Sequence, residues 1–527
     1  MAPKRVTLEA VVGEIDGIHR DLARLSVDER LGRASALTNT DIFESHPVPT
    51  KPKTLTYLRE LISSSDSPEQ ARRIETALFG CMDLTIFKET SNLVDMLNFY
   101  SARGRMHVDN EKVPLLEVVP WLQCQPDFDK REQMRKECTI FFKAINNPML
   151  TGILELTIRA VKQQFGFENY VRYAEAKKGI SFEEYEKVYR AYLDATYDTY
   201  RVRITPWVEE EIGRPFENLS RYHALYMVRI KRFDRFFPVT RLREIVEKTF
   251  AGLGFDLFAR KDLVVDLSDG PAKNPDGVCI GVEIPGEIHV LMKPVGGLID
   301  VETLLHEAGH AFFLSHISPQ LPAVYRRLYR SPALDETFAF LFMELIGNPV
   351  WLTSIAGMSP KEAADLTDLL QTKRLCLIRR YIGKFLAEKE LHEKGNIKDS
   401  GPYCRHLQAA TGFVYEPEAY LVDMDSDFYS LEYLRAWAGA HALQTHLEGI
   451  FGQEWFSSPQ AGELLRRLAS SGRRDSVEEV LTPLVAGPPV CPHSRGIDLR
   501  RIIRYKKSLR ILRRESEPVG GARRTAN

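Results

Sequence analysis

The residues best suited to do chemistry lie in one short segment, His306-Glu307-Ala308-Gly309-His310, inside an apolar run that is typical of a helix. A helix turns about 100° per residue, so two histidines four positions apart project their imidazoles from one face and can hold a single zinc ion. Glu307 lies between them and is not a ligand in this arrangement. Its carboxylate can instead take a proton from water at the metal, so the segment predicts a zinc site with a general base.

The flanking sequence predicts a helix of about four turns around this motif. Gly296-Gly297 precede it, and Asp300 is expected to be the N-cap, with Glu302 in the first turn. Apolar residues continue beyond the second histidine until Ser318-Pro319 end the segment. This context favours a metal site over a buried helix whose histidines only make hydrogen bonds.

A catalytic zinc site usually has three protein ligands and one open position for water, so a third side chain is needed. His316 stands where the metzincin pattern HExxHxxGxxH has its third histidine, but Phe313 replaces the glycine that turns the chain out of the helix. The helix should therefore continue, which places His316 about 120° around from His310 and too far along the axis to reach the same metal. We expect His316 to lie at the helix C-terminus instead.

The other known solution is a glutamate from a following helix, as in gluzincins. The spacings of the thermolysin and aminopeptidase groups would place that glutamate at position 330 or 329. The chain has Arg330 and Tyr329 there, so both short-spacing groups are excluded.

A second helix is expected over Ala333 to Ile346, with Ser331-Pro332 at its start and Gly347-Asn348-Pro349 at its end. Glu336 and Glu344 interrupt its otherwise apolar sequence. A carboxylate in so apolar a helix is costly to bury unless a cation meets it, and zinc would supply that charge.

These two helices and the connection of about twenty residues between them resemble the gluzincin family of thimet oligopeptidase, oligoendopeptidase F and the peptidyl-dipeptidases. In that family the third ligand lies slightly fewer than about thirty residues after the first histidine. The resemblance therefore implies Asp335 or Glu336. We prefer Glu336, because its longer arm suits a ligand that reaches from a second helix and Glu is usual in this group. Glu344 either orients a histidine ring or is paired elsewhere as an ordinary surface or helix carboxylate.

The resemblance also assigns roles to two other regions. Gly286 to Pro294 is expected to form a short strand, and in the family a strand before the metal helix is the edge on which an extended peptide pairs. Family members supply a tyrosine from a late helix to stabilise the oxyanion, for which Tyr433 is the first candidate and Tyr429 the second. The glycine-rich surroundings of that tyrosine in thimet oligopeptidase are missing here. His441 and His446 follow on the same helix and are candidates for substrate contact.

The chain of 527 residues is 44% hydrophobic and can bury a large core. Strand signals are sparse outside residues 255 to 294, so the expected fold class is mainly α, with one small sheet beside the zinc helix. The clearest helical patterns cover Leu8 to Leu31, Gln70 to Tyr100, Asp129 to Gln164 and Phe182 to Thr199. The resemblance implies two lobes around a deep channel: a helical lobe over residues 1–250 and a catalytic lobe over 251–490, followed by a basic segment over 491–527.

The formal net charge of −1 gives no general argument for binding to nucleic acid or membranes. Seven scattered cysteines without CxxC spacing indicate neither a disulfide framework nor a second structural zinc site. The N-terminus lacks an apolar signal core and no apolar run is long enough to span a bilayer, so a soluble, cytoplasmic protein is expected. The basic stretch from Arg495 to Arg514 is expected to pack its apolar side on the protein, with contact to acidic partners or a membrane surface as the alternative.

The sequence therefore predicts a metallopeptidase that uses one zinc ion, held by His306, His310 and Glu336, to hydrolyse oligopeptides. Glu307 is predicted to deprotonate the water and to return the proton to the departing amine. Two alternatives stay open: a zinc carboxypeptidase or dipeptidase with the same metal helix, and a non-catalytic helical scaffold with a vestigial site. Retention of Glu307 argues against the scaffold, because a structural zinc has no use for a base and normally fills all four coordination positions.

Overall fold

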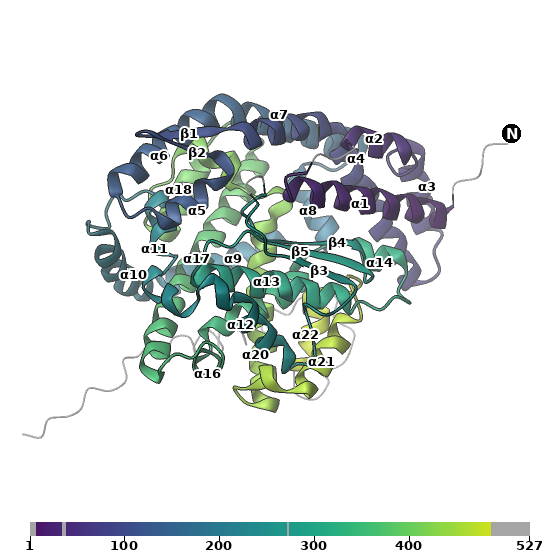
Figure 1. Cartoon of the computed structure of the whole chain (residues 1–527). Helices are drawn as coiled ribbons and strands as arrows, with labels where there is room; N and C mark the ends of the chain where they lie inside the picture. Colours follow the sequence, from purple (N-terminus) through teal and green to yellow (C-terminus); the bar gives the residue numbers. More distant parts are fainter. Residues whose placement is uncertain (1–6, 34–37, 271–272, 486–527) are drawn as a thin grey trace, which may run out of the picture.

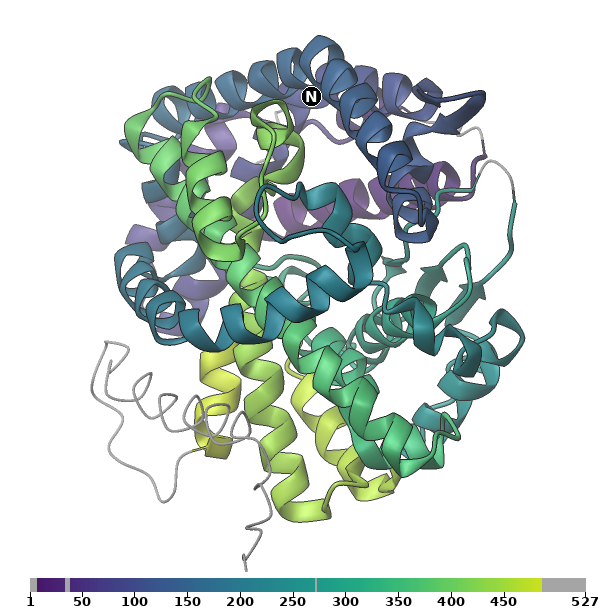
Figure 2. The same ribbon diagram turned by 90° about the vertical axis from the view of Figure 1, so that its left-hand side faces the viewer.

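The computed structural model describes residues 7–33, 38–270 and 273–485, and its architecture is mainly helical. The N-terminal helices lie at one end of the molecule and the last helices, α21 and α22, at the other (Figures 1 and 2). The basic segment predicted over 491–527 lies outside the described residues. None of the described helices is both long and apolar enough to cross a lipid bilayer.

The first half of the chain contains the helices α1 (Leu8–Arg30), α2 (Asn39–Ser45), α3 (Pro52–Ser63), α4 (Pro68–Arg103), α5 (Val118–Cys124), α6 (Phe128–Phe141), α7 (Asn147–Arg159), α8 (Tyr170–Lys178), α9 (Phe182–Ala195), α10 (Tyr197–Ile212), α11 (Arg221–Met227) and α12 (Val239–Ala251). The second half contains α13 (Leu298–Ser315), α14 (Ala323–Arg327), α15 (Ala333–Met343), α16 (Pro349–Ser354), α17 (Pro360–Lys394), α18 (Gly401–Thr411), α19 (Tyr420–Asp423), α20 (Tyr429–Phe451), α21 (Pro459–Ala469) and α22 (Val477–Val485). The helical patterns expected over Leu8 to Leu31 and Gln70 to Tyr100 are each confirmed as one helix. The pattern over Asp129 to Gln164 is helical throughout but includes π-helical turns after α6 and α7, and the pattern over Phe182 to Thr199 is broken at Thr196, between α9 and α10.

Local sequence explains where the long N-terminal helices begin. The Thr7 hydroxyl accepts a hydrogen bond from the Ala10 N–H at the start of α1. At the start of α4, Ser67 caps the helix and Pro68 occupies the first helical position, where a missing N–H leaves no hydrogen bond unmade. These caps explain why α1 starts at the predicted residue and α4 two residues before it.

Two small sheets accompany the helices, one more than expected. β1 (Arg105–Val108) and β2 (Glu111–Pro114) form an antiparallel hairpin, which sequence analysis missed because each strand has only four residues. The second sheet contains β3 (Leu263–Asp266), β4 (Val278–Glu283) and β5 (Glu287–Leu291) in the order β3-β5-β4. It lies within the region where strands were expected.

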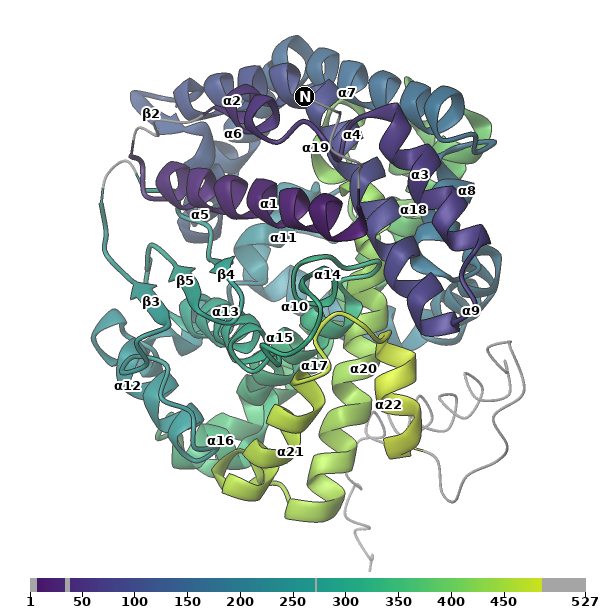
Figure 3. The ribbon, with the colours of Figure 1, turned by 90° about the vertical axis from the view of Figure 1, so that its right-hand side faces the viewer.

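The strand before the HExxH helix is not an edge strand, which corrects the expectation for residues 286–294. β5 pairs in parallel with β3 on one side and antiparallel with β4 on the other. Ile288 and Val290 on one face of β5 belong to the large core that includes α13, whereas Leu291 packs with Val27 of α1. The sheet therefore lies between α1 and α13 (Figure 3), and β3 and β4 are its two edge strands, each paired only with β5.

The helix that carries the HExxH segment begins two residues before the expected N-cap. Gly297 is the N-cap of α13, and the Asp300 carboxylate lies in the first turn, where it accepts hydrogen bonds from the N–H groups of Val295 and Gly296. Phe313 continues the helix as expected, and His316 is its C-cap.

Buried apolar residues form two large clusters. The larger cluster contains the inward faces of α13 and α15. It also contains buried apolar residues of the first half of the chain, the first of them Met106. The second is built mainly from α1, α4 and α8 and takes in Phe428 and Leu431 from the start of α20. Both clusters thus combine residues from the two halves of the chain, and the division at residue 250 stays a prediction.

Candidate metal centre

Two packed helices bring the candidate ligands together. His306 and His310 lie one turn apart on α13, with ring centroids 4.9 Å apart. Between them, Gly309 faces α15 so closely that a Cβ atom there would lie 2.6 Å from Ala339 Cα and 2.7 Å from the Phe338 oxygen. The glycine of the motif is therefore required for α15 to approach the histidines.

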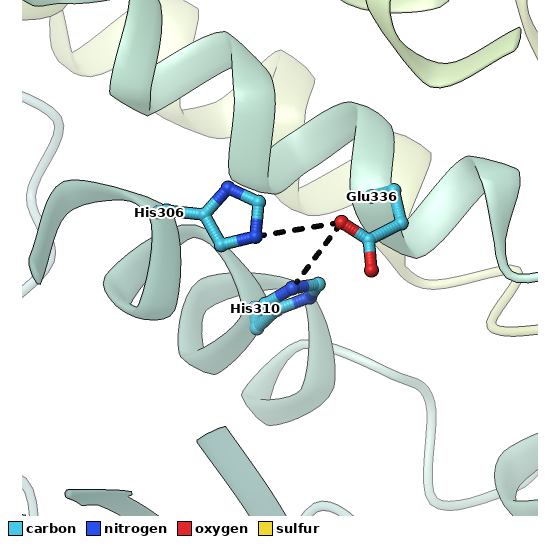
Figure 4. A group of neighbouring side chains, drawn as sticks. All are labelled: His306, His310 and Glu336. Atoms are coloured by element: carbon cyan, nitrogen blue, oxygen red, sulfur yellow. Dashed lines mark ion pairs between the residues drawn. The ribbon is translucent and has the colours of Figure 1, made fainter. Parts of the chain in front are cut away.

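Glu336 lies in the first turn of α15 and points at both imidazoles (Figure 4). Its Oε2 atom is 3.4 Å from His306 Nε2 and 3.6 Å from His310 Nε2. Among the described residues these three side chains form the one group whose ligand atoms, all within 4.8 Å of one another, could hold a metal ion.

The donor set fits zinc. Two imidazole nitrogens and one carboxylate are the ligands of a catalytic zinc site with an open position. Glu336 Oε2 is buried without a hydrogen-bond donor among the described residues, which suits an oxygen that meets a cation. The side chains of both histidines are 15% exposed, so the site is accessible to a small ion and water.

Asp335 has a different role from its neighbour. His310 Nδ1 lies 2.7 Å from Asp335 Oδ1, an interaction that fixes the ring with Nε2 toward Glu336. Arg473 Nη2 donates to the other carboxylate oxygen at 2.9 Å. Asp335, which the family resemblance left as an alternative ligand, thus holds a histidine ring, the role considered for Glu344.

The electrostatics of the group follow from these contacts. Burial alone would lower the pKa of His310, but the carboxylates of Glu336 and Asp335 raise it to about 10. Burial would raise the pKa of Asp335, but His310 and Arg473 lower it to about 2. Two adjacent buried carboxylates are thus kept ionised by positive neighbours, and a metal ion bound at His310 Nε2 would take the place of a proton there.

Glu307 lies beside the group with a free carboxylate. Its side chain accepts no hydrogen bond from the described residues, although the residue is only 8% exposed. Gly277, just before β4, approaches so closely that a Cβ atom would lie 2.3 Å from Thr303 and 3.4 Å from Glu307 Cγ. The absence of a side chain at Gly277 therefore leaves room beside the carboxylate.

Comparison of the sequence with protein-family models and with curated proteins gives no match. Solved structures do match over almost the whole chain. A Bacillus anthracis str. Ames protein assigned as an oligoendopeptidase F superposes with a TM-score of 0.59 at 16% identity, over 95% of this chain and 90% of its own. PZ peptidase A with an inhibitor superposes with a TM-score of 0.58 at 15% identity, over 97% of this chain and 98% of its own. The chain has the oligoendopeptidase F fold.

This fold confirms the predicted resemblance and the mainly helical class with small sheets. At such low sequence identity the match establishes the backbone fold only. The role of each side chain in this oligoendopeptidase F fold therefore rests on the geometry around it.

The two candidate tyrosines both lie near the metal group on α20 but have different surroundings. The Tyr429 hydroxyl donates a 2.6 Å hydrogen bond to Glu336 Oε1. Tyr433 packs edge-on against Phe340, whose ring in turn contacts His306, and its hydroxyl has no hydrogen bond to the described residues. Burial and the Glu336 carboxylate raise the pKa of both tyrosines, so both keep their protons.

The other residues considered from the sequence do not join the group. Glu344 forms an ion pair with Arg374 at the end of α15, which is the ordinary alternative for this residue. His316 packs on aromatic rings, and burial lowers its pKa to about 4, so it is neutral and gains nothing from the helix dipole. His441 and His446 lie about three turns or more beyond Tyr429 on α20 and supply no atom to the group.

Sequence reasoning missed Arg473, which supports Asp335. It follows α21, and it also donates to the Arg327 carbonyl oxygen at 2.9 Å. No motif marks this arginine, because it acts through contacts across 138 residues of sequence. Asp335 itself could have been noticed as the second acidic residue in the first turn of an apolar helix.

Proposed function

We propose that this protein is a zinc-dependent metallopeptidase that hydrolyses peptide bonds in oligopeptides. The observation that carries the proposal is the convergence of His306, His310 and Glu336, with the free carboxylate of Glu307 beside them. The fold shared with an oligoendopeptidase F and a PZ peptidase supports it. A zinc ion held by the three side chains would polarise the scissile carbonyl and lower the pKa of the attacking water.

The chain supplies the proton transfers through Glu307. The carboxylate takes a proton from the attacking water and delivers it to the nitrogen of the departing amine. Because no described residue donates a hydrogen bond to Glu307, its lone pairs are available for this exchange. Asp335 contributes by keeping the His310 ring in one orientation.

The two tyrosines have different roles in this proposal. Tyr429 already donates to Glu336 Oε1, so it orients this carboxylate. The Tyr433 hydroxyl is free of other described residues and protonated, so it is the better donor to the oxyanion that forms on the scissile carbonyl. This assignment keeps Tyr433 as the first choice for the reaction.

The edge of β4 is the best place for an extended peptide. β4 has a neighbouring strand on one side only, and its N-terminal end follows Gly277 beside Glu307. Toward its other end, Arg327 donates to the carbonyl oxygens of Gly281 and Val282 at 3.0 and 2.9 Å. Backbone pairing of substrate along the first part of β4 would bring a peptide bond toward Glu307 without selecting its sequence.

The test is cleavage of a quenched fluorescent peptide library by the zinc-loaded protein. Wild type should cleave, whereas Glu307→Gln should retain zinc and lose at least about 10²–10⁴-fold in turnover, as expected for loss of a general base. Glu463→Gln, an exposed residue of α21, is the matched control and should behave as wild type. Full activity of Glu307→Gln, or no cleavage by a zinc-loaded wild type, would contradict the proposal.

Peptides blocked at one end or the other separate modes of cleavage. An endopeptidase cleaves them regardless of blocking, whereas a carboxypeptidase or dipeptidase fails when the relevant terminus is capped. Mass analysis of the products assigns the bond that is cut.

A further inference from the structure

The turn that starts α20 has an unusual backbone. Asp427 and Phe428 are consecutive non-glycine residues with φ angles of 56° and 52°. The left-handed region is tolerated by Asp but unfavourable for Phe, whose Cβ crowds the neighbouring backbone in this conformation. Such a turn persists only where surrounding contacts fix it, and Tyr429 follows it directly.

Side chains of the N-terminal half hold this turn. Phe428 is 1% exposed and packs against the rings of Tyr170 and Phe182. The Asp427 carboxylate forms ion pairs with Lys177 Nζ at 2.9 Å and Lys178 Nζ at 3.2 Å, both at the end of α8. The Lys178 side chain is fully buried and that of Lys177 is 6% exposed.

The same end of α8 also contacts the chain just before α15. Arg330 donates to the carbonyl oxygens of Lys177 at 2.6 Å and Ala176 at 2.7 Å. These carbonyls carry the negative end of the helix dipole, which favours a cation. In addition, Lys178 Nζ lies 3.2 Å from Glu432, one turn into α20. The C-terminal end of α8 is therefore bonded to the segments that precede both Glu336 and Tyr429.

The consequence reaches the metal group through one hydrogen bond. The direction of the Tyr429 side chain depends on the backbone of the two residues before it. Its hydroxyl meets Glu336 Oε1 at 2.6 Å, and no other hydrogen bond to this carboxylate is present among the described residues. A change in the turn would thus move the hydroxyl away from a candidate metal ligand.

We propose that Lys177 and Lys178, acting through Asp427, are positioning residues that hold Tyr429 against Glu336. The end of α8 is thereby a support of the metal site contributed by the N-terminal half of the chain. The inference rests on the proposed function only in that Glu336 is taken as a zinc ligand.

A double-mutant cycle on zinc affinity tests this support without any peptide. The variants are Asp427→Asn, Tyr429→Phe and the double variant, with zinc affinity measured by competition with a chromophoric chelator. Asn keeps the size of Asp and tolerates a positive φ, and Lys177 retains its ion pair with Asp83 at 2.7 Å. The change thus removes the carboxylate charge while the turn can still form.

Tyr429→Phe should weaken zinc binding by about 10- to 100-fold, and Asp427→Asn by up to about tenfold, as expected for outer contacts of a metal site. In the Tyr429→Phe background, Asp427→Asn should change affinity by less than about twofold, because its effect passes through the missing hydroxyl. Asp368→Asn, which breaks an ion pair with Arg203 elsewhere on the surface, is the matched control and should leave zinc affinity unchanged.

The proposal would be overturned if Asp427→Asn bound zinc with wild-type affinity. It would also be overturned if the fold-loss of zinc affinity in the double variant equalled the product of the fold-losses in the two single variants. If Asp427→Asn does not fold, Lys177→Met and Lys177→Arg replace it in the same cycle. Met should weaken zinc binding and Arg should restore most of it, and equal affinities for the two would again overturn the inference. A protein that binds zinc as described but cleaves no peptide would contradict the proposed function and leave the positioning role supported.

Discussion

Asp335 and Glu388 are both buried carboxyl groups that accept hydrogen bonds, yet their surroundings move the pKa in opposite directions. Burial would raise the pKa of Asp335, but His310 and Arg473 lower it to about 2. Glu388, on α17 behind the start of α20, accepts hydrogen bonds from Asp425 N–H and the Ser430 hydroxyl. There, burial and the neighbouring Asp425 raise the pKa to about 8, although Lys384 opposes the shift.

The comparison shows that the partners of a carboxyl group, more than its burial, decide whether it keeps a charge. At the candidate metal centre, Arg473 and His310 keep the Asp335 carboxylate ionised, and negative charge is available for a cation. On α17, by contrast, the raised pKa keeps the Glu388 carboxyl group protonated and neutral. The centre is thus distinguished by its positive neighbours, and removing them should make it resemble the α17 group.

The largest expected effect comes from removing the Asp335 charge. Asp335→Asn leaves His310 without its carboxylate acceptor, so the ring loses its preferred orientation and zinc affinity should fall by about 10- to 100-fold. Chelator competition measures this change. Asp425→Asn, beside Glu388, is the control and should bind zinc as wild type does. Equal zinc affinities of Asp335→Asn and wild type would contradict the role of Asp335 in orienting the His310 ring.

A smaller effect is expected from Arg473→Met. Asp335 then keeps His310 but loses a charge-assisted hydrogen bond, which should lower the free energy of unfolding by about 1–3 kcal/mol and raise the pKa of Asp335. Denaturant unfolding measures the loss. Arg474→Met, which removes only a partly exposed contact with Asp475, should lower stability by less than about 1 kcal/mol. Equal free energies of unfolding for the two variants would show that the hydrogen bond from Arg473 to Asp335 does not stabilise the fold more than a surface contact does.

Much of the candidate metal centre could be predicted from sequence, but only where chemistry and spacing are local. His306, Glu307 and His310 share one helix, so the period of the helix already places them on adjacent positions. Glu336 was predicted as the third ligand because a carboxylate is rare at the start of an apolar helix and because the family resemblance gave a spacing. Its approach to the histidines depends on Gly309, whose close contact with α15 was not foreseen.

The rest depended on contacts between distant segments. Asp335 was considered as a ligand, but only the position of Arg473 and the direction of the His310 ring reveal its role. The strand order was equally hidden: the pattern of residues 286–294 predicted a strand, whereas its place in the middle of the sheet depends on β3 and β4. The fold class, in contrast, followed from helical periodicity alone.

The last expected effect concerns Glu388 and is a change in pH dependence. The folded pKa of about 8 lies above the ordinary value of 4.5, so the folded state holds an extra proton between these values. The stability from this group is present at low pH and is lost as pH rises toward 8, by up to about 1.4 kcal/mol per pH unit. Glu388→Gln, which stays neutral, should lose less stability than wild type between pH 6 and 8 in denaturant unfolding. Parallel pH profiles of the two proteins would contradict the neutral state of Glu388.

The central claim is that Glu336 completes a zinc site with His306 and His310. Zinc content of the purified protein, measured by mass spectrometry after dialysis against trace zinc, tests it most directly in Glu336→Ala and Glu344→Ala. Both variants remove a glutamate from the same segment, but Glu344 is paired with Arg374 away from the histidines. Wild type and Glu344→Ala should each hold one zinc ion and Glu336→Ala almost none; stoichiometric zinc in Glu336→Ala would contradict the account.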